Sequence, residues 1–454
     1  MGRIKEGQIL LEQHAQDYSY EGYGVIRVEK YPIFVENMLA TEIADIKIVK
    51  STSQFAFAQV IKFHKVSKHR ILVDNINLLK SGAAPLMIVN YNKQLEFKQK
   101  IIESLFKRNL PSVVKINKIV KSPLMWHYRN KISLHVNYEN VPAKLGIFVK
   151  NSHELVPQTS FDLGYEEIDK IAKKLINVIR DFSSQEENNF VKNIKLHEVT
   201  IKYSQSSKEG QIIFKCLENK RIPDEFVNAI LKEMPNIVLT QNVTSKDKLR
   251  IYKTYKLTKN QKVEFRIKDL RFRVSANAFY QINEQQIAQI YEYISNNLEL
   301  NGTECLADLY AGVGTIGMYL SNKVKKVVCV ELNRQATIDG DINSRLNNLT
   351  NTSFYKSDVL KFIDRVGFKD SIDVAVIDPP RGGLHPNIIF SMANKKISKI
   401  VYLSCNPRTL VRDLKLFADR DYQIKLVQPF DMFPQTYHIE TLVILERQFY
   451  DKEN

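Results

Sequence analysis

The sequence predicts a multidomain protein with a small N-terminal β-barrel, an α+β middle domain and a C-terminal α/β domain whose mainly parallel sheet is doubly wound. Three observations support this prediction. The 454 residues are enough for two or three domains that each bury a core. Short β-rich runs fill the first part of the chain. From about residue 283, strands alternate with helices.

The first 66 residues are predicted to form the barrel. Runs rich in Val, Ile, Phe and Tyr are broken by Gly, Pro, Asn or charged residues, as in short strands joined by turns. About five such strands suit a small barrel. The clearest runs lie at 22–28, 31–37, 44–50 and 56–63, and a linker is expected at 64–70.

Residues 67–270 are predicted to form the α+β middle domain. A helix is expected at 94–108 because its apolar residues fall on one face, and a second helix is expected at 168–182. Strand-like runs surround the second helix. These runs lie at 131–138, 144–150, 198–204 and 211–218.

Residues 271–454 are predicted to form the doubly wound domain. A helix should begin after Asn283, which suits an N-cap with Gln286 three residues on. Apolar strands then alternate with helical stretches, which favours a parallel sheet with helices on both faces. The strands are expected at 304–310, 326–332, 371–378, 399–404 and 441–447.

The composition favours a soluble globular protein with a polyanionic partner. The hydrophobic fraction is 44%, and no apolar run approaches the roughly 18–20 residues that a bilayer span needs. Lys and Arg total 66 against 50 for Asp and Glu, and the net charge of +16 favours nucleic acid first and an anionic membrane surface second. Codon bias toward Lys, Asn and Ile is an alternative explanation. The first residues contain no apolar signal core, so we expect a cytoplasmic protein that does not bind membranes.

Four cysteines are spread along the chain, and none forms a Cys-x-x-Cys pair. This pattern excludes a zinc ribbon and a thioredoxin-like motif and suits a reducing compartment. Cys216, Cys305 and Cys329 lie inside apolar strands, so we expect them to be buried and inert. Cys405 differs because it lies between a predicted strand and a predicted helix.

A glycine-rich loop follows the first strand of the C-terminal domain. In DLYAGVGTIGMYL, Gly312, Gly314 and Gly317 have the G-x-G-x-x-G spacing that lets a ligand approach the backbone. Glu331 ends the next strand, 19 residues after Gly312, where an acid can accept hydrogen bonds from ribose hydroxyls. The pattern indicates an adenosine-containing cofactor. NAD and a ligand-free glycine turn remain alternatives.

Two further motifs end strands of the same domain. Asp378 opens DPPRGGLHP, where two prolines stiffen a loop that can present the carboxylate to a ligand; a rigid surface turn is the alternative. Cys405 opens CNPRTL, where the following helix N-terminus would favour a thiolate for conjugate addition; a buried inert thiol is the alternative. Near the last strand, His438 and Glu440 would share a face if the strand has begun there, and such a pair can supply a general base; solvated surface residues are the alternative.

Together these motifs resemble the S-adenosylmethionine-dependent RNA (uracil-5)-methyltransferases, most closely the 23S ribosomal RNA branch. DLYAGVGTIG, CVELN, DPPRGG and SCNPRTLVRDL follow in the family's order, and the resemblance covers nearly the whole chain. It implies that SYEGYGVIRVEKYPIFVENML belongs to an RNA-binding TRAM domain, an OB-like barrel. It also implies a central RNA-binding domain and a class I, Rossmann-like methyltransferase domain.

The resemblance also implies a role for each candidate residue. S-adenosylmethionine would donate the methyl group, Cys405 would add to uracil C6, and Glu440 would remove the C5 proton. Thiolate addition makes C5 nucleophilic, so the reaction needs no metal. The cofactor pocket would be formed by Gln281, Tyr310, Gly312, Glu331 and Asp378, with Asp358 near the adenine.

RNA, most closely 23S ribosomal RNA, is the implied partner of a monomeric enzyme. Base flipping would expose the uracil, and the stretches 126–131 and 266–273 are candidate RNA contacts, although solvated strand faces explain both equally well. Residues 71–99 lack the four cysteines that hold an iron–sulfur cluster in many relatives, so no cluster is expected. Ala311 replaces a frequent Cys, and Gln435 replaces a frequent His and leaves the hydrogen bonding around Glu440 open.

Three other functions are weighed against this one. A transfer-RNA methyltransferase of the same family usually lacks the N-terminal barrel. A NAD-dependent oxidoreductase leaves SCNP, DPPR and the barrel unexplained. A non-catalytic RNA-binding protein on the same scaffold predicts loss of Cys405 or Glu440, and both are present.

Overall fold

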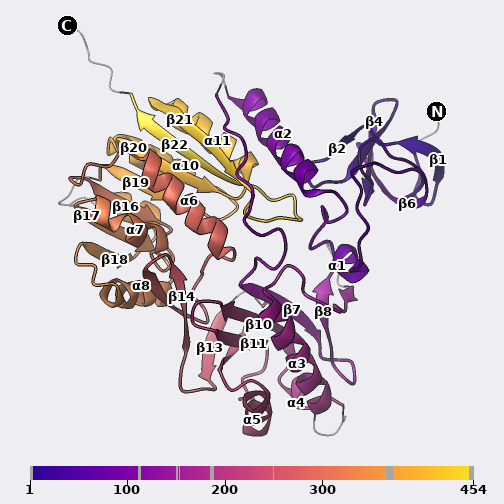
Figure 1. The fold of residues 1–454 in the computed structure, drawn as a ribbon, viewed down its shortest axis with the longest axis horizontal. Coiled ribbons are helices and arrows are strands. Elements are labelled where there is room, and N and C mark those ends of the chain that lie inside the picture. Colours follow the sequence, from indigo (N-terminus) through magenta and orange to yellow (C-terminus); the bar gives the residue numbers. More distant parts are fainter. Residues whose placement is uncertain are drawn as a thin grey trace.

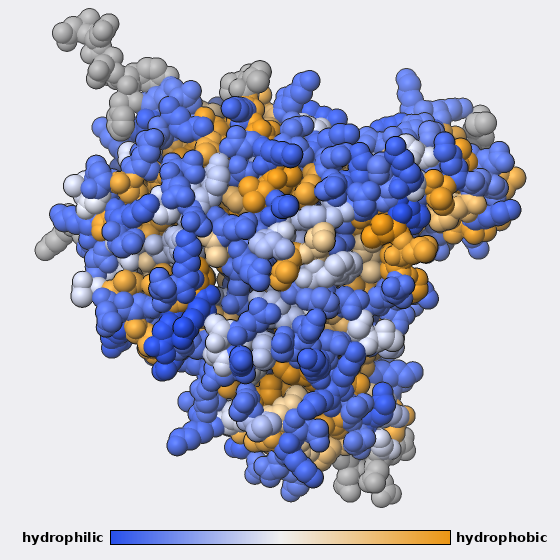
Figure 2. All heavy atoms as spheres, in the orientation of Figure 1, coloured by the Kyte–Doolittle hydropathy of each residue, from blue (hydrophilic) through white to orange (hydrophobic). Residues whose placement is uncertain are grey.

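The computed structural model describes residues 4–110, 114–149, 152, 154–184, 189–248, 250–364 and 372–448. The chain forms an N-terminal sheet, a middle sheet and a C-terminal sheet, which occupy three separate regions of Figure 1. Hydrophilic residues cover most of the face in Figure 2, with apolar patches between them. Among the described helices, none combines the length and apolar character that crossing a membrane requires.

The N-terminal sheet has six strands in the order β1-β5-β6-β4-β3-β2. All neighbours are antiparallel except β4 and β6, and the apolar side chains of Ile26, Ile33 and Ile46 form part of its core. The four strands predicted in this region are confirmed. That the sheet is an OB-like barrel stays a prediction. The strands are β1 Ile9–His14, β2 Asp17–Tyr18, β3 Gly24–Val28, β4 Tyr31–Glu36, β5 Ile43–Ser51 and β6 Ala56–Lys65.

The middle sheet has seven strands in the order β13-β12-β11-β10-β7-β8-β9. Helices α3 and α5 pack on it, because their apolar faces, which include Ile168, Leu175 and Phe226, share one core with β10–β12. The strands are β7 Lys131–Asn137, β8 Lys144–Phe148, β9 Leu155–Val156, β10 Leu196–Ser204, β11 Glu209–Cys216, β12 Ile237–Thr244 and β13 Ile251–Lys256. The helices are α3 Glu166–Phe182, α4 Phe190–Asn193 and α5 Asp224–Glu233.

The segment between the two sheets contains α1 (Ile76–Lys80) and α2 (Tyr91–Asn109). The predicted helix at 94–108 is therefore present, and the Asn90 side chain caps it by accepting from the Lys93 amide at 3.0 Å. In sequence α2 lies within the range expected for the middle domain. Its buried residues Ile102 and Phe106 nevertheless pack into the core of the C-terminal sheet, so α2 covers that sheet. Helix α2 also contacts the N-terminal sheet, since the Phe97 and Tyr18 ring centres lie 5.4 Å apart.

The C-terminal sheet has the strand order β18-β17-β16-β19-β20-β22-β21. The first five strands are parallel, and β22 is antiparallel to both of its neighbours. Two cores lie on opposite faces of this sheet: α6 and α7 share one, and α2, α9, α10 and α11 share the other. The strands are β16 Cys305–Leu309, β17 Lys326–Glu331, β18 Thr352–Lys356, β19 Val374–Ile377, β20 Lys399–Ser404, β21 Tyr422–Phe430 and β22 Glu440–Arg447.

Short elements complete this region. A hairpin of β14 and β15 precedes helix α6 and packs on the α6 side of the sheet. Asn283 caps α6 as predicted and accepts from the Gln286 amide at 3.1 Å. The elements are β14 Lys262–Ile267, β15 Leu270–Ser275, α6 Glu284–Asn297, α7 Thr315–Leu320, η1 Ser321–Lys323, α8 Arg334–Leu346, α9 Val359–Asp364, α10 Pro386–Asn394 and α11 Pro407–Ala418.

Candidate active site

The predicted site residues gather at one edge of the C-terminal sheet. The parallel strands β16, β17, β19 and β20 end at this edge, where ligands bind in doubly wound sheets. Because β22 runs the opposite way, its first residue lies at the same edge, and Ser404 pairs with Thr441. The insertion of β22 therefore brings Glu440 beside Cys405, although 34 residues lie between them in the chain.

The glycine loop after β16 has the backbone geometry that the spacing predicts. Gly312 and Gly314 have φ values of 57° and 81°, in the left-handed region that favours glycine. The Gly312 amide donates to Glu331 Oε2 at 2.9 Å, and the Asn333 amide donates to Oε1 at 2.6 Å. Backbone amides thus hold the Glu331 carboxylate at the end of β17, next to the loop.

Asp308, the first residue of DLYAGVGTIGMYL, was not among the predicted site residues. It is buried, and its Oδ2 accepts from the Gly317 amide at 2.8 Å, while Oδ1 has no hydrogen-bond partner. Burial, helped by the Glu331 carboxylate, raises the pKa of Asp308 to about 7. The signal that could have identified Asp308 was an acidic residue near the end of a strand, just before a glycine loop.

Gln281 and Asp378 meet as predicted for one pocket. Gln281 Nε2 donates to Asp378 Oδ2 at 2.8 Å. Burial and then the Asp308 carboxylate raise the pKa of Asp378 to about 7, and the bond from Gln281 opposes the rise. The carboxyl groups of the buried Asp308 and the partly buried Asp378 thus lie at the ends of the neighbouring strands β16 and β19.

Tyr310 and Asp358 lie at the same edge of the sheet. Burial and then the Asp358 carboxylate raise the pKa of Tyr310 to about 12, so the two side chains are close enough to interact. Asp358 is exposed, and its carboxylate accepts from the Lys361 amide at 3.1 Å at the start of α9. The proximity of Asp358 to Tyr310 is consistent with their predicted roles in one cofactor pocket.

Two apolar side chains at the site were not predicted. Phe279 is 57% exposed and Leu332 is 65% exposed, so both present apolar surface beside the polar groups of the site. Leu332 directly follows Glu331, and the Phe279 carbonyl lies 3.9 Å from where a Cβ on Gly312 would be. Such side chains suit a flat apolar ligand group. The leucine after the acid in CVELN was the available signal.

Cys405 is partly buried between β20 and α11. The Asn406 side chain caps helix α11, because its Oδ1 accepts from the Arg408 amide at 3.2 Å. Its Nδ2 donates to the Arg381 carbonyl at 3.0 Å, and this bond connects the SCNP and DPPR segments. Other groups outweigh the expected effect of the helix N-terminus on the Cys405 thiolate. Burial, then Glu440 and Asp378, raise the pKa of Cys405 to about 12 against the opposing charge of Arg381. The other three cysteines are buried, as predicted.

Glu440 is the first residue of β22 and is only 5% exposed, so it is not a solvated surface residue. Its Oε1 has no hydrogen-bond partner. Burial and then the Asp378 carboxylate raise the pKa of Glu440 well above its ordinary value. His438 lies before the strand begins, so the shared strand face expected for the pair does not form. The His438 Nε2 instead lies 3.4 Å from Arg381 Nη2.

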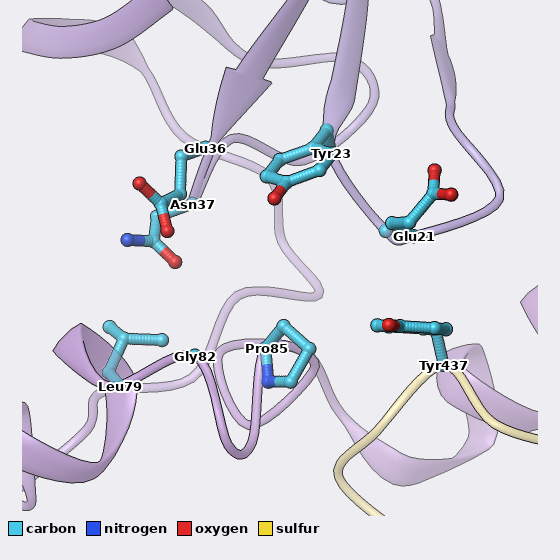
Figure 3. A pocket seen from close by; sticks show the side chains of 9 residues that line it. Glu21, Tyr23, Glu36, Asn37, Leu79, Gly82, Pro85 and Tyr437 are labelled. Atoms are coloured by element: carbon cyan, nitrogen blue, oxygen red, sulfur yellow. The ribbon is translucent and has the colours of Figure 1, made fainter. Parts of the chain in front are cut away.

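The N-terminal part of the chain reaches this site. The Arg408 guanidinium lies 4.1 Å from the centre of the Tyr20 ring and 3.8 Å from Glu21. Tyr20 in turn contacts Tyr437, with ring centres 6.0 Å apart. Figure 3 shows the adjoining pocket. Side chains of the N-terminal sheet and its turns line one side of that pocket, and residues of the α1 segment and Tyr437 line the other.

The two stretches named as candidate RNA contacts are largely engaged within the protein. In 266–273, Arg271 and Arg273 both pair with Glu264, at 2.8 and 3.5 Å. In 126–131, Tyr128 is buried and its hydroxyl donates to the Pro434 carbonyl at 3.0 Å. Both stretches thus make contacts within the fold, and their contact with RNA stays a prediction.

Comparison with solved structures identifies the fold. The fold matches a crystal structure of Pyrococcus abyssi tRNA (uracil-54, C5)-methyltransferase in complex with S-adenosyl-L-homocysteine, with a TM-score of 0.74 over 96% of this chain and 100% of that chain. The sequence identity is 22%, so the match defines the fold alone. The protein therefore shares the multidomain fold, with mixed α/β sheets, of that methyltransferase.

Sequence comparison then gives the family. The model of the tRNA (Uracil-5-)-methyltransferase family matches residues 90–448. An RNA methyltransferase of Enterococcus faecalis is 33% identical over 98% of both chains, and one of Lactobacillus johnsonii is 33% identical over 96% of this chain and 98% of the relative. The chain belongs to the tRNA (Uracil-5-)-methyltransferase family and is an S-adenosylmethionine-dependent RNA methyltransferase, as the motifs indicated.

Proposed function

We propose that the protein transfers a methyl group from S-adenosylmethionine to C5 of a uridine in RNA through a covalent bond between Cys405 and uracil C6. Glu440 removes the C5 proton. The observation that carries the proposal is the antiparallel pairing of β20 with β22, which joins the end of one strand to the start of the other. A thiol and a buried carboxyl group thereby lie at one edge of the sheet, close enough for the carboxylate to raise the pKa of the thiol.

The residues at the sheet edge fit the cofactor. Asp308 Oδ1 is buried without a partner, and Asp378 lies beside it, so a cationic ligand would gain from both carboxylates. Glu331 suits ribose hydroxyls, and Leu332 suits the adenine ring. When bound, S-adenosylmethionine supplies an electrophilic methyl group. Gln281, Tyr310, Gly312 and Asp358 complete the proposed pocket.

The proposed reaction needs only the Cys405 thiolate as nucleophile and the Glu440 carboxylate as base. The Cys405 thiolate adds to C6, the S–C6 bond forms, and the C5=C6 electron pair moves onto C5 and the adjoining carbonyl. C5 takes the methyl group, and S-adenosylhomocysteine leaves. Glu440 then accepts the C5 proton, the C5=C6 bond reforms, and the S–C6 bond breaks to release the thiolate.

The Cys405 thiol and the Glu440 carboxyl group must each lose a proton before they can act. The Cys405 pKa of about 12 keeps the thiol protonated near neutral pH, and the raised pKa of Glu440 favours its neutral form. Loss of the thiol proton therefore precedes addition. Arg381 favours that loss, because its charge opposes the rise in the pKa of Cys405. Glu440 must likewise be ionised before it removes the C5 proton.

We propose 23S ribosomal RNA as the substrate, bound by residues 1–66 as an OB-like TRAM domain and by residues 67–270, with residues 271–454 as the methyltransferase domain. The chain would act as a monomer. Transfer RNA is the second candidate substrate, favoured by the description of the family and by the substrate named for the Pyrococcus abyssi protein.

One experiment tests both the reaction and the substrate. Purified protein is incubated with methyl-labelled S-adenosylmethionine and with ribosomal or transfer RNA, and 5-methyluridine is mapped by mass spectrometry. Cys405→Ala should abolish methylation, and Cys216→Ala, which changes a buried cysteine of the middle sheet, should leave it at the parental rate. Glu440→Gln should accumulate a covalent protein–RNA adduct. Parental methylation by Cys405→Ala would refute the mechanism.

A further inference from the structure

The loop that precedes Glu440 is held in place by hydrogen bonds from other segments of the chain. It spans residues 431–439 and joins β21 to β22. Four consecutive carbonyl groups of this loop accept hydrogen bonds from groups elsewhere in the chain, at 2.9 to 3.1 Å. The pairs are Asn283 Nδ2 to Met432, Lys98 Nζ to Phe433, Tyr128 Oη to Pro434, and the Leu86 amide to Gln435.

From these contacts we infer that Gln94 and Lys98 of helix α2 are positioning residues, which fix Glu440 by holding the loop in front of it. The inference rests on the proposed role of Glu440 as the base. The carboxyl group of Glu440 is not itself fixed by hydrogen bonds at both oxygens, because Oε1 has no partner. Its position therefore depends on the backbone that carries it.

The first contact from α2 is a fully buried ion pair. Lys98 Nζ lies 2.5 Å from Asp431 Oδ1, and both side chains are 0% exposed. Asp431 directly follows Phe430, the residue that pairs with Glu440 across the hairpin. The ion pair thus fixes the loop at the strand end opposite Glu440. Because a buried ion is costly without its partner, this contact defines one position of α2 against the loop.

The second contact is a reciprocal pair of amides. Gln94 Nε2 donates to Gln435 Oε1 at 2.7 Å, and Gln94 Oε1 accepts from the Gln435 amide at 3.0 Å. Gln94 is 1% exposed and Gln435 is 3% exposed. Gln435 has a φ of 66°, a conformation that residues other than glycine adopt only when their surroundings hold them. The Gln94 side chain supplies part of that hold, together with the Leu86 amide and the Met125 carbonyl.

These contacts predict which chemical step depends on α2. Removal of the C5 proton is the step assigned to Glu440, and it follows methyl transfer. A small displacement of the carboxyl group should slow release of the covalent adduct and leave the earlier steps intact. Misplacement by about 1 Å can cost about 100-fold in rate, so we expect release to slow by about 10-fold to about 100-fold.

The test uses Gln94→Ala and Gln435→Ala in the full chain, with Asn92→Ala as a matched control. Asn92 is also an amide on α2, and it lies on the exposed face. Single-turnover assays with methyl-labelled cofactor measure methyl transfer, and denaturing gels measure the adduct and its release. The two test variants should accumulate adduct while binding S-adenosylmethionine with parental affinity, and Asn92→Ala should match the parent. Parental release rates in both test variants would overturn the inference.

A second pair of variants separates positioning from stability. Lys98→Met leaves Asp431 unpaired, so it should lower the unfolding temperature, whereas Lys98→Met with Asp431→Leu removes both charges and should recover much of that loss. Adduct release should stay slow in the double variant, because the bond from Lys98 to the Phe433 carbonyl is also lost. Recovery of both stability and release would reduce Lys98 to a structural role.

Failure of the inference differs from failure of the proposed function. If Glu440→Gln accumulates adduct and the Gln94 and Gln435 variants do not, only the positioning role is wrong. If Glu440→Gln gives no adduct and parental turnover, the proposed base is wrong, and the positioning inference falls with it.

Discussion

Gln281 and Asp378 lie 97 residues apart in the chain, and a 2.8 Å hydrogen bond from Gln281 Nε2 to Asp378 Oδ2 joins them. Gln281 belongs to the segment that enters the C-terminal domain, and Asp378 follows β19. The bond orients a carboxyl group whose pKa is raised to about 7 by burial and then by the Asp308 carboxylate. Both carboxyl groups at the proposed cofactor site therefore have raised pKa values.

Affinity for S-adenosylmethionine should rise with pH through about 7. Both Asp308 and Asp378 have raised pKa values, so they bind protons below about pH 7 and are ionised above it. The cationic cofactor favours the ionised forms, and a pKa difference of one unit corresponds to about a tenfold change in affinity. Calorimetry between about pH 6 and about pH 8 measures the change, and Asp378→Asn should reduce it. Binding that does not vary with pH would contradict the prediction.

Alkylation of Cys405 should accelerate by about tenfold per pH unit from about pH 7 to about pH 9, without a plateau, because the pKa of the thiol is about 12. Glu440→Gln should speed the reaction at about pH 9, since the Glu440 carboxylate helps to raise that pKa. Iodoacetamide labelling with peptide mass spectrometry gives the rate, and the three buried cysteines serve as internal controls. A plateau below about pH 9 would show that the thiol ionises more easily.

Gly314→Ala should lower the free energy of unfolding by about 1–3 kcal/mol, through a strained backbone and overpacking. Gly314 has a φ of 81°, and an added Cβ would lie 2.4 Å from Phe354 Cζ. Gly302→Ala is the matched control, because its φ is 93° and no atom lies within 4 Å of an added Cβ. Urea denaturation compares the two variants. Equal losses would mean that Phe354 moves aside without cost.

Tyr20→Ala should weaken binding of substrate RNA and leave the affinity for S-adenosylmethionine unchanged. Tyr20 carries the contact with Arg408 beside Cys405, and loss of an aromatic or cation–π contact to RNA is worth about 1–2 kcal/mol, or about 5-fold to about 30-fold in affinity. Tyr31→Phe is the control, because that hydroxyl bonds to the Thr52 carbonyl within the N-terminal sheet. Fluorescence anisotropy measures RNA affinity, and an unchanged value for Tyr20→Ala would refute the prediction.

Local sequence determined the elements of the catalytic domain and the loops that carry its chemistry. The Asn283 cap, the left-handed glycines at 312 and 314, and the start of α11 at Pro407 follow from short-range rules of capping and backbone freedom. The two edge strands of the C-terminal sheet were not predicted. β18 is short and half exposed, and β21 mixes polar residues and a proline with its apolar ones, so neither has a clear apolar pattern.

The tertiary structure decided which side chains share a site and how they ionise. Helical periodicity assigns polar residues to the solvent face, yet Gln94 and Lys98 are buried, because their partners in the loop 431–439 lie more than 300 residues away in the chain. The same holds for Cys405, whose pKa is raised by burial and by Glu440 and Asp378 from other strands. Desolvation and charge act through space, so only the folded chain sets the protonation state of the proposed nucleophile.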